Sequence, residues 1–181
     1  MNTRLPLHAT LLGLGLAVPA TAQFGNEWVE FVHNPGSLAS AASDISDPDN
    51  EVDFASGDLD RDGIDDLVVV RKQPFTTNGK RTNILLMSEY GVLVDRTSEY
   101  ASTSDVPGDQ GFLTPTNDRD VILVDVDGDS WLDVVTAPTR SDSSTKAVGH
   151  PRIYMNLGSD GAGDWLGLKY EESRIPQFLL L

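Results

Sequence analysis

The chain has 181 residues and a formal net charge of −15 at pH 7, from 13 Lys and Arg against 28 Asp and Glu. Such an acidic chain repels nucleic-acid phosphates and anionic membrane surfaces, so neither is an expected partner. There is no Cys, so the fold cannot depend on disulfides.

Residues 1–22 have the pattern of a secretory signal peptide. A short basic start, Met1 to Arg4, precedes a mostly apolar stretch, Leu5 to Val18, and small residues follow in an Ala-x-Ala arrangement that ends at Ala22. The apolar stretch is shorter than the ~20 residues that span a bilayer, which disfavours a membrane anchor. We therefore expect cleavage near Ala22, export to the cell surface, periplasm or medium, and no membrane span in the mature chain.

The rest of the chain predicts an all-β fold, because short β-branched and aliphatic runs are separated by turn residues. An irregular segment, with one helical turn at most at 37–43, precedes two groups of four strands, and a connector rich in Ser, Pro, Gly and Asp joins them. Four strands are the content of one propeller blade. The predicted strands are residues 52–56, 67–70, 84–87 and 92–95, then 121–124, 134–136, 153–156 and 165–170. The predicted division is an N-terminal segment at 23–50, a first blade at 51–100, a linker at 101–118, a second blade at 119–175 and a tail at 176–181.

The two groups of strands are copies of one repeat. Superposing Asp58 on Asp125, about 67 positions later, also aligns three further aspartates, and a strand follows in both copies. The spacing exceeds the ~40–50 residues of common propeller repeats, which longer hairpin loops would explain. The aligned pairs are Asp58 with Asp125, Asp60 with Asp127, Asp62 with Asp129, and Asp66 with Asp133.

The Asp-rich segments predict two calcium sites. Aspartates at alternate positions of a tight loop turn several carboxylates toward one point, and Ca²⁺ takes six to eight oxygen ligands. Two carboxylates held ~4 Å apart repel by about 4 kcal/mol at an effective dielectric near 20. Four in one loop therefore require protons or a cation, which disfavours a merely solvated acidic turn. Gly63 would supply the left-handed turn around the ion, and the carbonyls of Ile64 and Trp131 would add ligands.

The loops do not fit an EF-hand, which needs Glu at the twelfth position and a helix on each side. Counted from Asp58 the twelfth residue is Val69, and counted from Asp125 it is Thr136. Both lie in β-branched runs, so each loop leads into a strand. The ninth residue, Asp66 or Asp133, takes the place of the distant Glu.

Asp-x-Asp-x-Asp-Gly-x-x-Asp followed by Leu-Val-Val resembles the FG-GAP/VCBS repeats of integrin-α-type β-propellers. Residues 54–58 and 153–158 are also similar to blade segments of that family, and the resemblance extends from about Val52 to Tyr170. It implies structural calcium bound by ten residues. These are Asp58, Asp60, Asp62, Ile64 and Asp66 in the first loop, and Asp125, Asp127, Asp129, Trp131 and Asp133 in the second.

Two residues depart from the family pattern. Ser130 stands where the family prefers Gly, and a left-handed backbone there would cost ~1 kcal/mol. The second site is therefore expected to be weaker or differently turned. Asp65 is an extra carboxylate that we expect to face solvent, because the strand alternation points Asp66 the other way.

No catalytic constellation accompanies the loops. His33 and His150 lie in loop-like sequence without convergent partners and are interpreted as surface residues. Core packing is the favoured use of Trp28, Trp131 and Trp165, although they could stack on sugars. We therefore expect a secreted calcium-binding scaffold or adhesion-type module, not an enzyme, with an unidentified protein or carbohydrate ligand. The alternative is the non-catalytic propeller portion of an exported polysaccharide-active enzyme.

Propellers have about 4–8 blades, whereas this sequence shows two. The chain closes on an apolar run at 175–181. We expect the two blades to be a fragment of a larger β-propeller whose other blades lie beyond this end. A two-blade unit that assembles with copies of itself is the alternative.

Overall fold

The computed structural model describes residues 38–39, 51–73, 80–138 and 150–176. All of them belong to one compact unit, 35–181. The expected signal peptide, Trp28, His33 and the end of the apolar tail lie outside the described residues.

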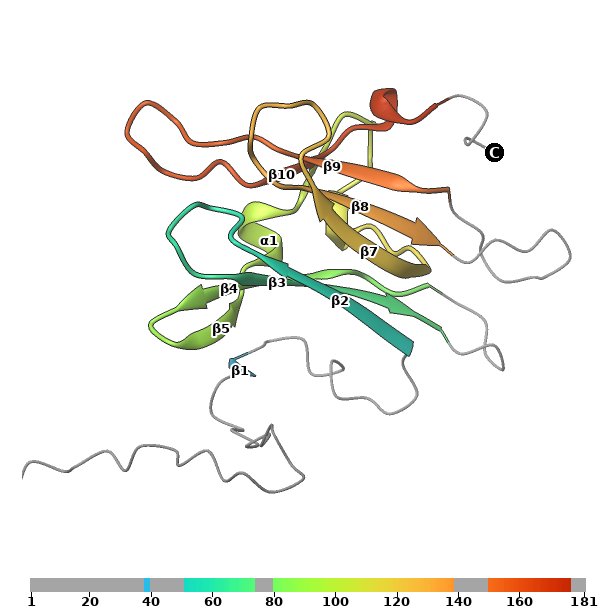
Figure 1. The fold of residues 1–181 in the computed structure, drawn as a ribbon. Helices are drawn as coiled ribbons and strands as arrows, with labels where there is room; N and C mark the ends of the chain where they lie inside the picture. The colour runs from blue at the N-terminus through green and yellow to red at the C-terminus, as the bar shows by residue number, and fades with distance from the viewer. Residues whose placement is uncertain (1–37, 40–50, 74–79, 139–149, 177–181) are drawn as a thin grey trace, which may run out of the picture. The chain divides into compact units, whose positions relative to one another are not determined.

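The first sheet is a meander of four antiparallel strands with a fifth strand at its edge (Figure 1). The meander contains β2 (Glu51–Gly57), β3 (Asp66–Lys72), β4 (Ile84–Glu89) and β5 (Val92–Asp95). β1 (Leu38–Ala39) lies outside β5 and is parallel to it. The turn between β4 and β5 has Tyr90 and Gly91 at positive φ, 52° and 80°, as a tight hairpin requires.

The second sheet repeats this arrangement. Its four antiparallel strands are β7 (Asp118–Val124), β8 (Asp133–Pro138), β9 (Arg152–Asn156) and β10 (Leu168–Tyr170). β6 (Thr103–Ser104) pairs with the outer strand β10 in parallel, as β1 does with β5. Within the described residues, neither sheet closes on itself and no complete propeller ring is formed.

The eight predicted strands are confirmed, most of them within two or three residues at each end. The predicted all-β class is correct as a mostly β fold, but each sheet has a fifth strand that the sequence did not predict. The helical turn considered at 37–43 is not found where the structure describes that segment, since Leu38 and Ala39 form β1. The helices of the described residues are short: α1 (Thr97–Tyr100) and two 3₁₀ turns, η2 (Gly111–Leu113) and η3 (Glu172–Arg174).

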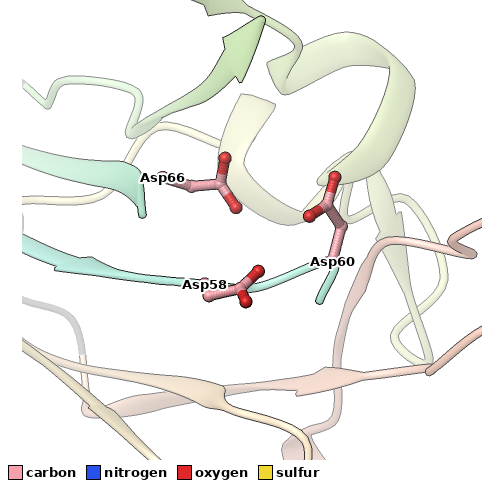
Figure 2. A group of neighbouring side chains, drawn as sticks. All are labelled: Asp58, Asp60 and Asp66. Atoms are coloured by element: carbon pink, nitrogen blue, oxygen red, sulfur yellow. The ribbon is translucent and has the colours of Figure 1, made fainter. Parts of the chain in front are cut away.

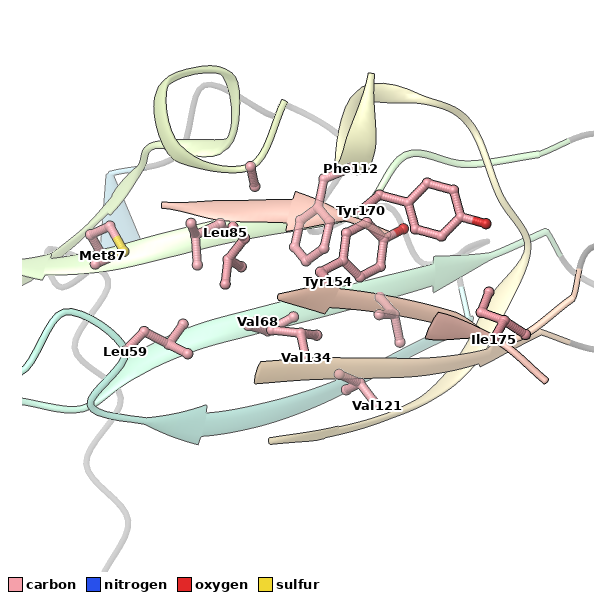
Figure 3. Packing of buried hydrophobic residues seen from close by; sticks show 13 residues of the cluster. Leu59, Val68, Leu85, Met87, Phe112, Val121, Val134, Tyr154, Tyr170 and Ile175 are labelled. Atoms are coloured by element: carbon pink, nitrogen blue, oxygen red, sulfur yellow. The ribbon is translucent and has the colours of Figure 1, made fainter. Parts of the chain in front are cut away.

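One hydrophobic core lies between the two sheets (Figure 3). The first sheet contributes Val68 and Leu85, and the second contributes Val134 and Tyr154, all of which are fully buried. The ring of Tyr154 packs edge-on against Phe112 of η2, with their centroids 4.6 Å apart. Because Phe112 belongs to the segment predicted as a linker, this segment is part of the core.

Buried polar contacts fix the same segment between the sheets. Asp118, at the start of β7, accepts hydrogen bonds from Asn83 Nδ2 at 2.6 Å and from Thr116 Oγ1 at 2.8 Å. Arg152 of β9 donates from Nη2 to Asp109 Oδ2 at 2.7 Å. Since unpaired buried polar groups are costly, these bonds specify one position for the connector.

Candidate metal centre

The Asp-rich loops follow β2 and β7, the first strand of each antiparallel meander, and have left-handed residues at the same two positions. In each loop the fourth and sixth residues have positive φ: 64° at Arg61 and 91° at Gly63, then 82° at Gly128 and 73° at Ser130. The first loop has its glycine at the sixth position, and the second loop has its glycine at the fourth. Ser130 adopts the left-handed conformation that the sequence comparison anticipated, and Arg61 does so as well.

In the first loop, two aspartates accept hydrogen bonds from the backbone that surrounds them. Asp58 Oδ2 accepts from the N–H of Gly63 at 3.0 Å, which closes the turn. Asp66, the first residue of β3, accepts from the N–H groups of Leu59 at 3.1 Å and Ser88 at 2.9 Å. The carboxylate of Asp66 therefore joins the loop to the neighbouring strand β4.

The second loop has the same pattern. Asp125 Oδ2 accepts from the N–H of Ser130 at 2.9 Å. Asp133, the first residue of β8, accepts from the N–H groups of Val126 and Asn156, both at 2.8 Å. The repeat seen in the sequence therefore extends to individual hydrogen bonds.

Each loop gathers three carboxylates. Oxygens of Asp58, Asp60 and Asp66 lie within 4.8 Å of one another, and the side chains turn toward a common point (Figure 2). Asp125, Asp127 and Asp133 form the equivalent group in the second loop. An all-oxygen donor set of this kind suits a hard cation, and each group could hold a metal ion.

Burial makes the first group unfavourable without a cation. Burial raises the pKa of Asp66 to about 6, with two backbone hydrogen bonds opposing the shift. It also raises the pKa of Asp60, to which the nearby charges of Asp62 and Asp58 add. In addition, Asp58 Oδ1 is buried and has no hydrogen-bond partner. A cation between these groups would compensate both the repulsion and the unpaired oxygen.

The second group is similar but more open. Burial raises the pKa of Asp133, and the charges of Asp127 and Asp129 act in the same direction. Asp133 is fully buried, whereas Asp127 is exposed and contacts Arg174 Nη2 at 3.3 Å. A cation at Asp127 would therefore compete with this surface ion pair.

Two other predicted ligands, Asp62 and Asp129, lie in the same loops but outside these groups of three carboxylates. Asp62 Oδ1 accepts from the N–H of Ile64 at 2.8 Å, and Asp129 Oδ1 accepts from the N–H of Trp131 at 2.8 Å. These carboxylates shape the second half of each turn. Asp65 is exposed, as expected.

Contacts between the loops were not predicted from the sequence. Asn156, at the end of β9, donates from Nδ2 to the carbonyl of Leu59 at 2.8 Å and to the carbonyl of Leu132 at 3.1 Å. The guanidinium of Arg61 lies 3.9 Å from the ring centroid of Trp131. The two loops are therefore neighbours that share one buried amide and one cation–π contact.

The tryptophans and the histidine in the described part of the chain are half-buried. Trp165 packs against the core and donates from Nε1 to Asn156 Oδ1 at 2.8 Å, which confirms its expected core role. Trp131 is half-buried beneath Arg61. His150 is half-buried rather than fully exposed, and its Nε2 lies 3.6 Å from Glu172 Oε1.

The left-handed Ser130 provides a test of the loop conformation. Replacing it with Gly removes a steric cost of roughly 1–2 kcal/mol, part of which is offset by the greater freedom of Gly in the unfolded chain. We expect Ser130→Gly to raise the free energy of unfolding by about 0.5 kcal/mol. Gly128→Ala should lower it by more than about 1 kcal/mol, because φ is positive there although space is free. Urea denaturation measures both free energies, and a destabilising Ser130→Gly together with a neutral or stabilising Gly128→Ala would contradict the assigned turn.

The raised pKa of Asp66 predicts how the metal-free protein responds to pH. Its pKa of about 6 in the folded chain exceeds the ~3.9 of an unfolded Asp. The folded state therefore holds this proton more tightly, and the associated stability is full below about pH 4 and lost as pH rises through about 6. With chelator present, we expect a higher melting temperature near pH 5 than near pH 7. Asp66→Asn should reduce this difference, and an unchanged difference in that variant would show that other groups cause it.

Comparison with family models, with curated proteins and with solved structures gave no match to this chain. The described residues themselves define its class: a mostly β protein of two repeated sheets, each with an Asp-rich loop that could hold a metal ion. No described helix has the length and apolar character needed to cross a membrane.

Proposed function

We propose that this chain is an exported, calcium-binding scaffold module of the FG-GAP/VCBS type, in which each four-stranded meander is a propeller blade. The observation that carries the proposal is the pair of three-aspartate groups at equivalent positions of two equivalent loops. One acidic turn could arise by chance, but a matched pair with matched hydrogen bonds indicates a shared requirement.

Calcium is the favoured ion because of the ligand chemistry. The candidate donors are carboxylates and main-chain carbonyls, and no described His or Cys lies in either group. Ca²⁺ accepts six to eight oxygens in flexible geometry, whereas Mg²⁺ demands a near-ideal octahedron and keeps several waters. Loops that supply alternate aspartates and backbone oxygens suit the larger ion.

The ion would have a structural role. Each loop connects the first two strands of a four-stranded meander, and its last aspartate also accepts a hydrogen bond from the backbone of the third strand. An ion held by the start and the end of the loop would therefore fix three strands. Metal binding of this kind contributes directly to folding stability.

The scaffold role is proposed from the resemblance to the FG-GAP/VCBS repeats, which implies structural calcium in these loops. The alternative is a non-catalytic propeller portion of an exported polysaccharide-active enzyme. An assay of polysaccharide cleavage by the full-length gene product separates the two, because only the alternative predicts cleavage, whereas a scaffold can also bind a carbohydrate ligand.

Isothermal titration calorimetry of the mature chain, residues 23–181, tests the proposal. We expect two calcium ions per chain, one absent in Asp60→Ala and the other in Asp127→Ala. Magnesium at the same concentration should bind much more weakly. Absence of binding in the parent would refute the calcium assignment, and full binding in both variants would refute the assigned ligands.

A further inference from the structure

The interface between the two sheets joins different faces of the same repeat. Cross-strand partners share a face, so Val121 lies with Thr136, and Ala55 lies with Val68. Val121 and Val68 belong to the shared core. In the aligned repeat, however, Val121 corresponds to Phe54 and not to Ala55. The face that the second sheet packs against the first is therefore opposite, in the repeat, to the face that the first sheet packs against the second.

The contact at this interface is close and specific. The N–H of Val121 donates to Asp53 Oδ2 at 3.2 Å, which links β7 directly to β2. A Cβ on Gly57 would come within 2.9 Å of Leu123 Cδ1 and 3.0 Å of Leu132 Cδ1. We call face A the face of the repeat that contains Ala55 in the first sheet and Ile122 in the second, and face B the face that contains Phe54 and Val121. Face A of the first sheet thus packs against face B of the second sheet.

This arrangement leaves one face of each kind facing outward. Face B of the first sheet exposes Val52 at 50% and Phe54 at 65% on β2. Face A of the second sheet exposes Ile122 at 57% on β7, with the half-buried Val135 beside it. Val124 adds a further 38% exposed side chain on the same strand. Large exposed apolar groups clustered in this way indicate an interaction surface.

Each exposed residue corresponds to a residue of the other repeat that packs at the internal interface. Phe54 corresponds to Val121, which is buried at the internal interface, and Ile122 corresponds to Ala55, which packs against the same core. On face B of the first sheet, the central residues Val69 and Leu86 are already buried. The exposure is therefore concentrated at the β2 border, the strand that makes the internal contact with β7 on the other face.

We infer that copies of this chain associate head to tail, with face B of the first sheet in one copy packed against face A of the second sheet in the next. Phe54 and Val52 of one copy then meet Ile122 and Val124 of the other, and the β2–β7 part of the internal interface is repeated between molecules. Such a contact joins two different surfaces, so it continues until a ring closes or a filament grows. A second copy supplies both complementary faces without any other partner.

Sedimentation velocity of the mature chain in calcium, over a wide concentration range, tests the inference. The parent should sediment as a species larger than a monomer. Phe54→Glu destroys face B and Ile122→Glu destroys face A, so each variant alone should be monomeric. An equal mixture of the two should form a one-to-one dimer, because each variant retains the face that the other needs.

The mixture distinguishes this contact from other modes of association. A symmetric contact between identical faces would leave at least one variant self-associating or would give no dimer on mixing. Leu166→Glu, which changes a side chain 50% exposed in the loop between β9 and β10, should associate like the parent. A parent that remains monomeric at every concentration overturns the inference, as does an oligomer that both face variants leave intact. Dimer formation in the mixture also shows that both variants are folded.

Discussion

Calcium is expected to raise the melting temperature of the mature chain by about 15 °C over its value in chelator. Each site contributes about 2.7 kcal/mol when free calcium is 100-fold above its Kd, so two sites contribute about 5 kcal/mol. For a domain of this size, each kcal/mol shifts the melting temperature by roughly 2–4 °C. Differential scanning calorimetry in calcium and in chelator measures the shift.

The matched variants separate ion binding from a general effect of negative charge. Asp60→Ala with Asp127→Ala removes one carboxylate from each group and should abolish most of the shift. Asp65→Ala with Asp164→Ala removes two exposed carboxylates outside the groups and should leave the shift intact. A shift lost equally in both double variants would mean that calcium acts by screening charge rather than by binding in the loops.

Replacing Asn156 with Ala is expected to lower the free energy of unfolding by about 3 kcal/mol. Its buried side chain donates to the carbonyls of Leu59 and Leu132 and accepts from the N–H of Gly158 and from Trp165 Nε1. Removing it leaves several buried groups without partners, each costing about 1–3 kcal/mol. Urea denaturation in calcium measures the loss.

The neighbouring residue provides the control. Leu157→Ala shortens a side chain that is 41% exposed and should change the free energy of unfolding by no more than about 0.5 kcal/mol. An equally small effect of Asn156→Ala would show that the two loops are not joined by this amide. Asn156→Asp is the sharper variant, because it retains an acceptor but loses both donated bonds.

The local pattern predicted most of the fold. Runs of β-branched and aliphatic residues between turn residues located the strands. Four aspartates in register located both loops, because side-chain spacing within a turn is a local property. The two-residue strands β1 and β6 could not be predicted, since segments so short have no periodicity. The buried position of Phe112 was also missed, because its neighbours have the composition of a loop.

Long-range partners explain what sequence inspection missed in the site. Asn156 contacts Leu59 across 97 positions, and Arg61 stacks on Trp131 from the other repeat. Only the packing of one sheet on the other brings these residues together. The left-handed conformation of Ser130 could be predicted from the sequence. The repeat aligns Ser130 with a loop position that prefers Gly.

A crystal structure of the mature chain grown in calcium, with anomalous data at long wavelength, tests the metal assignment most directly. The account expects one anomalous peak in each loop, about 2.3–2.6 Å from oxygens of Asp58, Asp60 and Asp66 in the first and of Asp125, Asp127 and Asp133 in the second. Carboxylates turned apart into solvent, with no peak between them, would contradict it.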